Sequence, residues 1–286
     1  MGRVKRILVV FSAISVVSAA GLGVEEARNL YHLSEFDRSL KILYSLPQKD
    51  AEVWGLIGKS HYGQADFKKA TEALEKAVAM NPGSSDLTLW LGRAYGRRAE
   101  TSSVFTAPGY ASKTRQYFEK ATNLDPNNLE AQSDLLEYYL EAPGFLGGGL
   151  DKAAAVAAQI ARINPSEGYW AQAKLAEKRK EYGTAEAHLR AAIAAAPQQV
   201  GRLLDLARLL TRQGRVQEAD QSLAKAEKIA PNSPKVLFTK AELYVKSKRN
   251  LEEAKQLLRH YLSLTLTPDD PPKADAEKLL KQAQGS

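Results

Sequence analysis

Three pairs of basic residues are the side chains in this sequence best suited to bind a ligand. The two members of each pair are four positions apart. The pairs are Arg93 with Arg97, Lys174 with Lys178, and Arg208 with Arg212. Residues at that spacing lie on the same face of an α-helix, where like charges slightly destabilise the helix. Their recurrence favours a role in binding, because cations hold the carboxylates of a ligand by charge-assisted hydrogen bonds.

The sequence contains no comparable pattern for catalysis or for metal binding. The four histidines are His32, His61, His188 and His260. They form neither the His-x3-His nor the His-Glu-x2-His arrangement that binds a metal, and no Gly-x-Ser-x-Gly nucleophile motif is present. The chain has no cysteine, which excludes disulfides and thiolate chemistry. We therefore predict a protein that is not an enzyme and that uses no metal or cofactor.

Three consecutive glycines, residues 147–149, precede an expected helix, as in loops that bind phosphate. The Gly-Lys-Ser/Thr signature of such a loop is missing, and no strand pattern comes before the glycines. Leu150 and Asp151 follow instead, and Asp151 is predicted to be the N-cap of a helix that begins at Lys152. Nucleotide binding is not expected.

The elements that must carry the basic pairs are helices in a repeating order. Residues 51–84 show the pattern most clearly: Trp54-x2-Ile57-Gly58-x2-His61, then Ala70-x3-Leu74-x2-Ala77, then Pro82. Small residues such as Gly58 and Ala70 let helix backbones cross closely, and large apolar residues fill the space between them. Pro82 cannot continue a helix and so fixes the turn into the next unit. His61 is predicted to be a packed core residue.

This pattern resembles the tetratricopeptide repeat, a 34-residue helix-turn-helix unit with Trp-x2-Leu-Gly-x2-Tyr, Ala-x3-Phe and a closing Pro. The same frame recurs along the chain and gives about seven units. The expected units are 21–50, 51–84, 85–128, 129–165, 166–199, 200–233 and 234–268. The resemblance thus implies an all-α fold, an α-solenoid of repeats over residues 21–270. Residues 271–286 are expected to form a C-terminal capping helix and tail that cover the last apolar face.

In proteins of this family the first helix of each unit lines the concave surface, and the frame places two slots per unit there, four residues apart. The first slot holds Arg28, Lys59, Arg93, Glu137, Lys174, Arg208 and Glu242. The second slot holds His32, Gly63, Arg97, Glu141, Lys178, Arg212 and Lys246. Positive residues dominate both rows.

We predict from these rows that the groove binds a partner protein or an acidic peptide. The expected contacts are Lys59, Arg93, Arg97, Lys174, Lys178, Arg208, Arg212 and Lys246. The alternative is that cations in a last helical turn serve only the helix dipole and solubility. The carboxylate clamp of this family uses asparagine where this chain has Lys59, Arg93 and Arg208, so a chaperone C-terminus is not the expected ligand.

Two insertions break the repeat length. The first, near residues 99–108, is predicted to lengthen the turn of the third unit, and the second spans residues 142–149. Insertions in repeat arrays often carry binding, so Phe105, Tyr110 and Phe145 are candidate partner contacts. For Phe145, packing against the helices beneath is the favoured alternative.

The N-terminus has the order of a secretory signal peptide. Three basic residues within the first six precede an apolar run, residues 7–17, and small residues follow at 18–20. Residues 1–20 are therefore predicted to be cleaved, with export to the bacterial periplasm and a mature net charge of about +4 rather than +7. The alternative is an inner-membrane anchor facing the periplasm, although residues 7–23 fall short of the ~20 apolar residues that span a bilayer.

The sequence therefore predicts a non-enzymatic protein-interaction scaffold of the bacterial envelope, with a role in assembly, secretion or cell-wall metabolism. One alternative is a membrane-anchored assembly factor that retains residues 1–20. A second is an RNA-binding helical repeat, which export disfavours. The rows also lack interleaved aromatics for base stacking apart from Trp170 and Phe238, so nucleic acid is not an expected partner.

Overall fold

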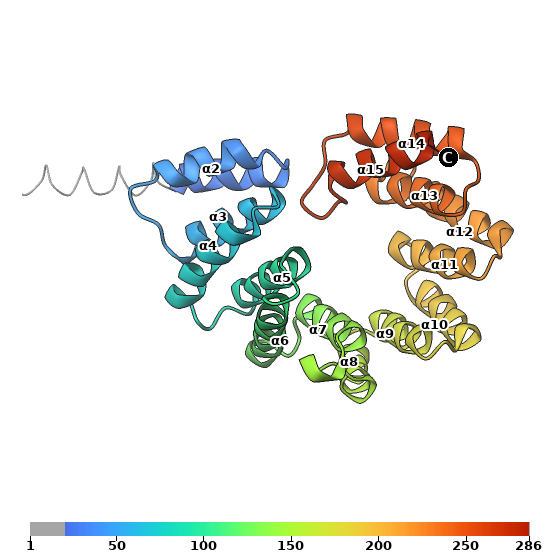
Figure 1. Ribbon diagram of the computed structural model, residues 1–286, viewed down its shortest axis with the longest axis horizontal. Helices are drawn as coiled ribbons and strands as arrows, with labels where there is room; N and C mark the ends of the chain where they lie inside the picture. Colours follow the sequence, from blue (N-terminus) through green and yellow to red (C-terminus); the bar gives the residue numbers. More distant parts are fainter. Residues whose placement is uncertain (1–20, 286) are drawn as a thin grey trace, which may run out of the picture. The chain divides into compact units, whose positions relative to one another are not determined.

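The computed structural model describes residues 21–285, and the regular elements in that range are all helices (Figure 1). The predictions of a signal peptide or an anchor at residues 1–20 lie outside the described part. The chain divides into two compact units, residues 1–124 and 125–286, which are described separately as unit 1 and unit 2.

Unit 1 consists of three successive helix pairs. Its helices are residues 21–32, α2 (Phe36–Ser45), α3 (Ala51–Gly63), α4 (Phe67–Met80), α5 (Ser85–Thr101) and α6 (Ala107–Leu124). The α3–α4 and α5–α6 pairs pack closely, and α4 packs against α5. The expected pairing of helices in the first three repeats is thus present.

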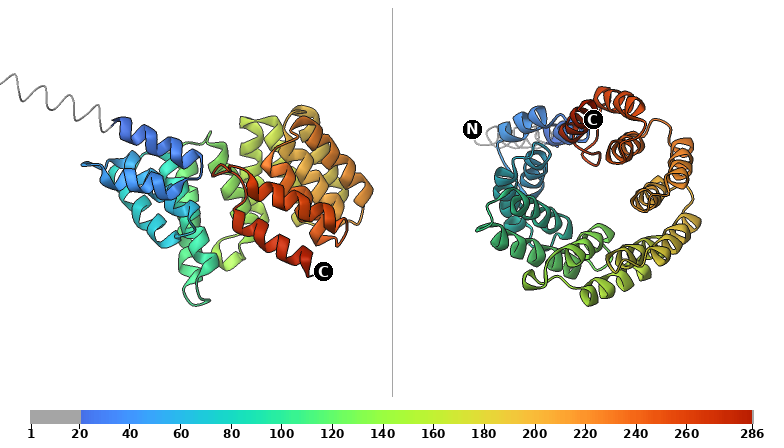
Figure 2. Two further views of the ribbon diagram at one scale, coloured as in Figure 1. Left: turned by 90° about the horizontal axis from the view of Figure 1, so that it is seen from above. Right: turned by 45° about the vertical axis from the view of Figure 1, so that its right-hand side comes forward.

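Unit 2 continues the same architecture with four helix pairs and a terminal helix. Its elements are α7 (Leu129–Glu141), the 3-10 turn η1 (Gly144–Leu146), α8 (Leu150–Ile163), α9 (Pro165–Lys178), α10 (Tyr182–Ala195), α11 (Val200–Arg212), α12 (Val216–Ile229), α13 (Pro234–Lys246), α14 (Leu251–Ser263) and α15 (Lys273–Gln284). Helix α15 packs on α14 and α13 (Figure 2). It buries Ala276, Leu279 and Ala283, as expected of a cap.

The close helix crossings occur at the small residues of the repeat. A Cβ atom on Gly58 would lie 2.5 Å from Leu74 and 3.2 Å from the Ala70 carbonyl oxygen, so α3 and α4 approach each other only because this position lacks a side chain. Ala70 and Ala77 are fully buried. His61 is also in the core, 6% exposed, and its Nε2 lies 2.9 Å from the Tyr44 hydroxyl.

The short turns inside the repeats use a residue in the left-handed conformation. These residues are Ser34, Ala65, Lys180, Gly214 and Lys248, with φ between 51° and 74°. After Lys180, the amide of Glu181 donates to the carbonyl of Ala176 at 2.9 Å, which is the hydrogen bond that closes a Schellman motif. The two repeats with insertions do not need this arrangement, since their helices are joined by longer segments.

The first insertion lengthens both helices as well as the turn between them, so the expectation from the sequence, which placed it in the turn alone, is corrected in part. α5 has 17 residues and α6 has 18, whereas α3 has 13, and only residues 102–106 lie between α5 and α6. The physical reason is the place of Pro108, in the first turn of α6, where a missing N–H breaks no helical hydrogen bond.

The glycines of the second insertion close a turn against the end of α7. A Cβ atom on Gly148 would lie 1.8 Å from the Ala142 carbonyl oxygen, and the Gly149 amide donates to the Tyr139 carbonyl at 2.9 Å. Because Gly149 occupies the N-cap position, α8 begins at Leu150, and Asp151 lies in its first turn rather than at its cap. The expectation of Asp151 as N-cap was therefore wrong.

Candidate functional site: the inner groove of unit 2

In unit 2 the first helix of each pair, namely α7, α9, α11 and α13, lies on the inner side of the curve that the unit forms (Figure 1). Adjoining hollows follow these helices and share the lining residues Lys174, Glu177, Asp205, Arg208 and Arg212. We call this surface the inner groove. Five of the basic residues predicted from the sequence line it.

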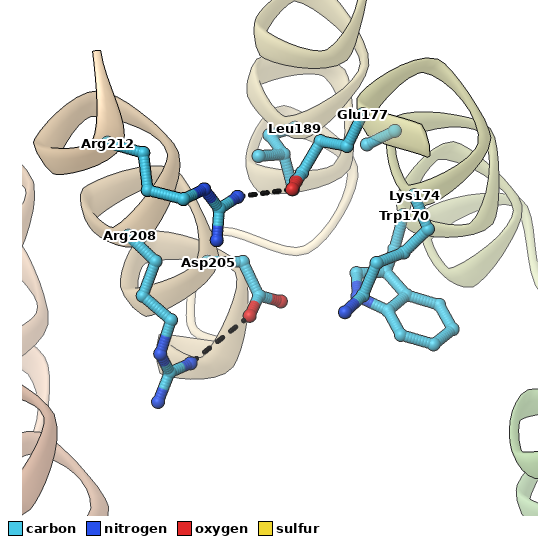
Figure 3. A pocket seen from close by; sticks show the side chains of 8 residues that line it. Trp170, Lys174, Glu177, Leu189, Asp205, Arg208 and Arg212 are labelled. Carbon is cyan, nitrogen blue, oxygen red and sulfur yellow. Dashed lines mark hydrogen bonds and ion pairs between the residues drawn. The ribbon is translucent and has the colours of Figure 1, made fainter. Parts of the chain in front are cut away.

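The middle hollow lies where α9 faces α11 (Figure 3). The Arg212 guanidinium forms an ion pair with Glu177 from α9. Arg208 lies 3.3 Å from the Asp205 carboxylate on its own helix. Both arginines therefore lie on the groove with a carboxylate in contact.

The α7 side of the groove has the same arrangement across a repeat boundary. Lys174 lies 3.4 Å from Glu137, and Lys178 lies 3.1 Å from Glu141. Each partner occupies the same slot in the preceding repeat, so the ion pairs run between equivalent positions of successive first helices. The signal for these pairs was present in the slot rows, which already held Glu137 and Glu141.

On the α13 side, Glu242 joins two cations. Its carboxylate lies 3.7 Å from Arg208 and 2.7 Å from Lys246. Arg208 also donates to the Thr239 hydroxyl at 2.9 Å. The groove therefore contains cations and carboxylates in contact with one another, and the predicted excess of positive charge is matched locally.

Sequence reasoning missed Glu177 and Asp205 as members of the groove, since neither occupies one of the two slots. Burial raises the pKa of the Glu177 carboxyl, an effect opposed by the nearby charges of Arg212 and Lys174. Desolvation makes a half-buried carboxylate depend on its partner, so Glu177, whose side chain is 22% exposed, depends on its ion pair with Arg212.

Trp170 and Arg202 lie beneath the charged residues of the groove. Trp170 is 7% exposed, with the Arg202 guanidinium 4.6 Å and the Lys174 ammonium 5.6 Å from its ring centroid. Arg202 in turn lies 2.7 Å from both Glu167 and Asp205. This network fixes α9 against α11, which sets the positions of the groove cations.

The remaining predicted cations belong to unit 1, on α3 and α5. Lys59 lies 2.8 Å from Asp86, and Arg97 lies 2.5 Å from Glu100. The Arg93 guanidinium is 5.0 Å from the centroid of the Trp90 ring. These side chains lie on the first helices of their repeats, as the frame placed them.

The three aromatic residues proposed as loop contacts differ in their surroundings. Phe105 is 92% exposed and Phe145 is 83% exposed, so the expectation that Phe145 packs against the helices beneath it was wrong. Its place in the tight η1 turn directs it outward. Tyr110 is half-buried, with its ring stacked 6.1 Å from that of Tyr95 and its hydroxyl 2.5 Å from Arg98.

Over residues 21–285, we find no group of three histidine, aspartate or glutamate side chains that could hold a metal ion. In that same range no helix combines the length and the apolar character needed to cross a membrane.

Repeated helix pairs with closely packed small residues, a capping helix and a charged inner surface define an α-solenoid, a class of repeat protein. Two family models described as tetratricopeptide repeat match the chain, at residues 56–98 and 176–236. The protein is a tetratricopeptide repeat protein. Such proteins generally mediate protein–protein interaction, and the fold is typical of non-catalytic scaffolds.

Solved structures share this fold. A tetratricopeptide repeat protein of Parabacteroides merdae is 13% identical, with a TM-score of 0.61 over 93% of this chain and 99% of that one. A thermophilic TPR protein of Thermus thermophilus is 19% identical, with a TM-score of 0.55 over 67% of this chain and 98% of that one. At these identities the likeness concerns the fold alone. No curated protein sequence matches the chain.

Proposed function

We propose that this protein is an exported, non-enzymatic scaffold of the bacterial envelope that holds an extended segment of a partner protein in the inner groove of unit 2. The observation that supports this proposal is the set of cations along the groove. Lys174, Lys178, Arg208, Arg212 and Lys246 come from three successive first helices and keep between 35% and 63% of their side-chain surface exposed. A partner can therefore reach them.

Binding in this groove would exchange ion pairs. The cations contact carboxylates that are themselves part of the surface, so an incoming carboxylate replaces one charge-assisted hydrogen bond by another. The pairs that Lys174 and Lys178 form with Glu137 and Glu141 are exposed. Exposed ion pairs contribute at most about 1 kcal/mol each, so exchanging these two pairs loses little stability. Hollows between α7 and α9 and between α11 and α13 leave room for the backbone of the incoming segment.

The test is crosslinking in intact cells followed by affinity recovery of the protein. Wild type is compared with an Arg208→Glu/Arg212→Glu variant and with a Lys225→Glu/Lys228→Glu control. The control changes net charge by the same amount on α12, where both lysines are exposed. We expect a discrete partner that is lost with the groove variant and kept with the control.

Charge reversal also places new Glu side chains near Glu177 and Glu242, where repulsion between like charges could destabilise the protein. A second variant that keeps an ion pair is therefore needed as a control. Exchanging Arg212 and Glu177 by Arg212→Glu/Glu177→Arg keeps an ion pair in the middle hollow while it reverses the polarity. Recovery of the same partner with both the reversed and the exchanged proteins would rule out the inner groove and leave Phe105 and Phe145 as the candidate contacts.

A further inference from the structure

The inner groove of unit 2 has a polarity of charge along its length. Helix α7 contains four carboxylates and neither lysine nor arginine. The carboxylates are Glu130, Asp134, Glu137 and Glu141. Their spacing places all four on one helix face, opposite the buried face that includes Leu135, Leu136 and Tyr139. The cations come next along the groove, on α9 and α11.

The α7 carboxylates are also accessible. The side chains of Glu137 and Glu141 are 53% and 77% exposed, even though they contact Lys174 and Lys178. Each lysine is therefore held on one side by an acidic residue that water still reaches. The first helix of the groove carries carboxylates alone, whereas the cations of the groove come from the second and third helices, where Glu177 and Asp205 accompany them.

A purely acidic ligand fits this arrangement badly. If its carboxylates took Lys174 and Lys178, they would leave Glu137 and Glu141 without their cations and would lie beside those like charges. Juxtaposed like charges disfavour binding. A ligand that carries a cation over α7 and carboxylates over α9 and α11 gives a new partner of opposite charge both to the α7 carboxylates and to the lysines that they release.

On the proposed function, we infer that the partner segment is amphoteric, with a basic residue that binds the α7 carboxylates and acidic residues that bind the cations of α9 and α11. Packed helices lie about 10 Å apart, and an extended chain rises about 3.3 Å per residue. The spacing is therefore about three residues per helix. The matching order is Lys-x2-Glu-x2-Glu, or its reverse if the segment runs the other way.

This order is testable with labelled synthetic peptides and the full-length protein, by fluorescence anisotropy. Three peptides with the same neutral residues carry Lys-x2-Glu-x2-Glu, Glu-x2-Lys-x2-Glu and Glu-x2-Glu-x2-Glu. The first two have identical composition, and the second cannot match α7, α9 and α11 at the same time in either direction. We expect the first peptide to bind at least about tenfold more tightly than the other two at low salt, with the difference reduced as salt screens the charges.

A variant of the protein supplies the matched control. Glu137→Lys and Glu141→Lys, combined with Lys174→Glu and Lys178→Glu, keep both ion pairs and the net charge and reverse the polarity between α7 and α9. At the positions of these ion pairs, the variant carries cations on α7 and carboxylates on α9, while the cations of α11 are unchanged. We therefore expect its preference to change to the Glu-x2-Lys-x2-Glu peptide.

Equal affinities for the two peptides of identical composition would overturn the inference, and so would an unchanged preference in the polarity variant. Tightest binding of the all-acidic peptide would overturn it while leaving the proposed function intact. Failure of all three peptides to bind would also contradict it. The proposed function fails separately, when the partner recovered from cells is insensitive to the groove variants.

Discussion

The cations of the inner groove differ in how readily they can change partners, because their carboxylates lie in different surroundings. Lys174 and Lys178 contact acidic residues of the preceding repeat, whereas Arg212 contacts Glu177, a carboxyl whose pKa burial has raised. Exposed pairs exchange partners at little cost, but a half-buried carboxylate such as Glu177 is destabilised when it loses its cation. The lysines of α9 are thus the residues best suited to release their partners to a ligand.

Outside the groove, we expect His61 to make the free energy of unfolding depend on pH. Burial lowers its pKa below the ordinary 6.5. The unfolded chain therefore binds a proton at higher pH than the folded protein does, so the free energy of unfolding falls as pH drops through 6.5. The groups that face this ring are Tyr44, Asp66, Lys69 and Glu72.

The measurement is urea denaturation of wild type and a His61→Gln variant between about pH 7.5 and 5.5, an interval that brackets the ordinary histidine pKa. Glutamine keeps a polar contact to Tyr44 and does not titrate. We expect the variant to lose less stability than wild type over this interval. Parallel pH profiles for the two proteins would show that His61 is not the group responsible.

Between helices, stability depends on the absence of side chains at a few crossings. A Cβ atom on Gly168 would lie 2.5 Å from the Ala161 Cα atom, where α9 crosses α8. Gly183, in α10, has no atom within 4 Å of the same position. Gly168 therefore has no space for a side chain, whereas Gly183, in the neighbouring helix, has open space around it.

We expect Gly168→Ala to lower the free energy of unfolding by about 1–3 kcal/mol, because the backbone of α8 must move. Gly183→Ala should raise it by about 0.5–1 kcal/mol, since alanine favours a helix and meets no neighbour. Chemical denaturation of both variants checks this pair. Similar shifts in the same direction would contradict the packing argument.

The turns within repeats offer a second test of the elements. Lys180 is exposed and adopts φ 63°, and Gly214 adopts φ 74° at the equivalent turn of the next repeat. The left-handed conformation costs a residue with a side chain about 1–2 kcal/mol. We expect Lys180→Gly to stabilise the protein by about 0.5–1 kcal/mol and Gly214→Ala to destabilise it by about 1 kcal/mol. A loss of stability in Lys180→Gly, measured by thermal or urea unfolding, would refute this reason.

The repeat frame was predictable because its signals are local. Gly58 and Ala70 indicate a close helix crossing by their small size, and Pro82 indicates a turn by its missing N–H. The helix pairs can be predicted from these residues. The ion pairs depend on how successive repeats pack, which the sequence does not show. Glu137 and Glu141 occupy slots of the repeat frame and could be noticed there, whereas Glu177 lies outside the slots and was not predicted. The extension of α5 and α6 was missed because the Thr-Ser-rich insertion resembles a loop.

At the level of the entire chain, the proposal of export can be tested by measuring the intact mass of the native protein. Residues 1–20 have the order of a signal peptide. We expect the protein isolated from its native host to begin at residue 20 or 21 and to appear in the periplasmic fraction. Recovery of the full-length chain from the membrane fraction would favour the anchored alternative instead.

Whether the inner groove of unit 2 holds the partner can be decided by site-specific photo-crosslinking in living cells. A photoreactive amino acid replaces Lys246, which lines the groove with 63% of its side chain exposed, or Lys225, which is exposed on α12. We expect a discrete crosslinked product from the first position and none from the second. A product from Lys225 alone, or from both positions equally, would contradict the assignment of the inner groove as the binding surface.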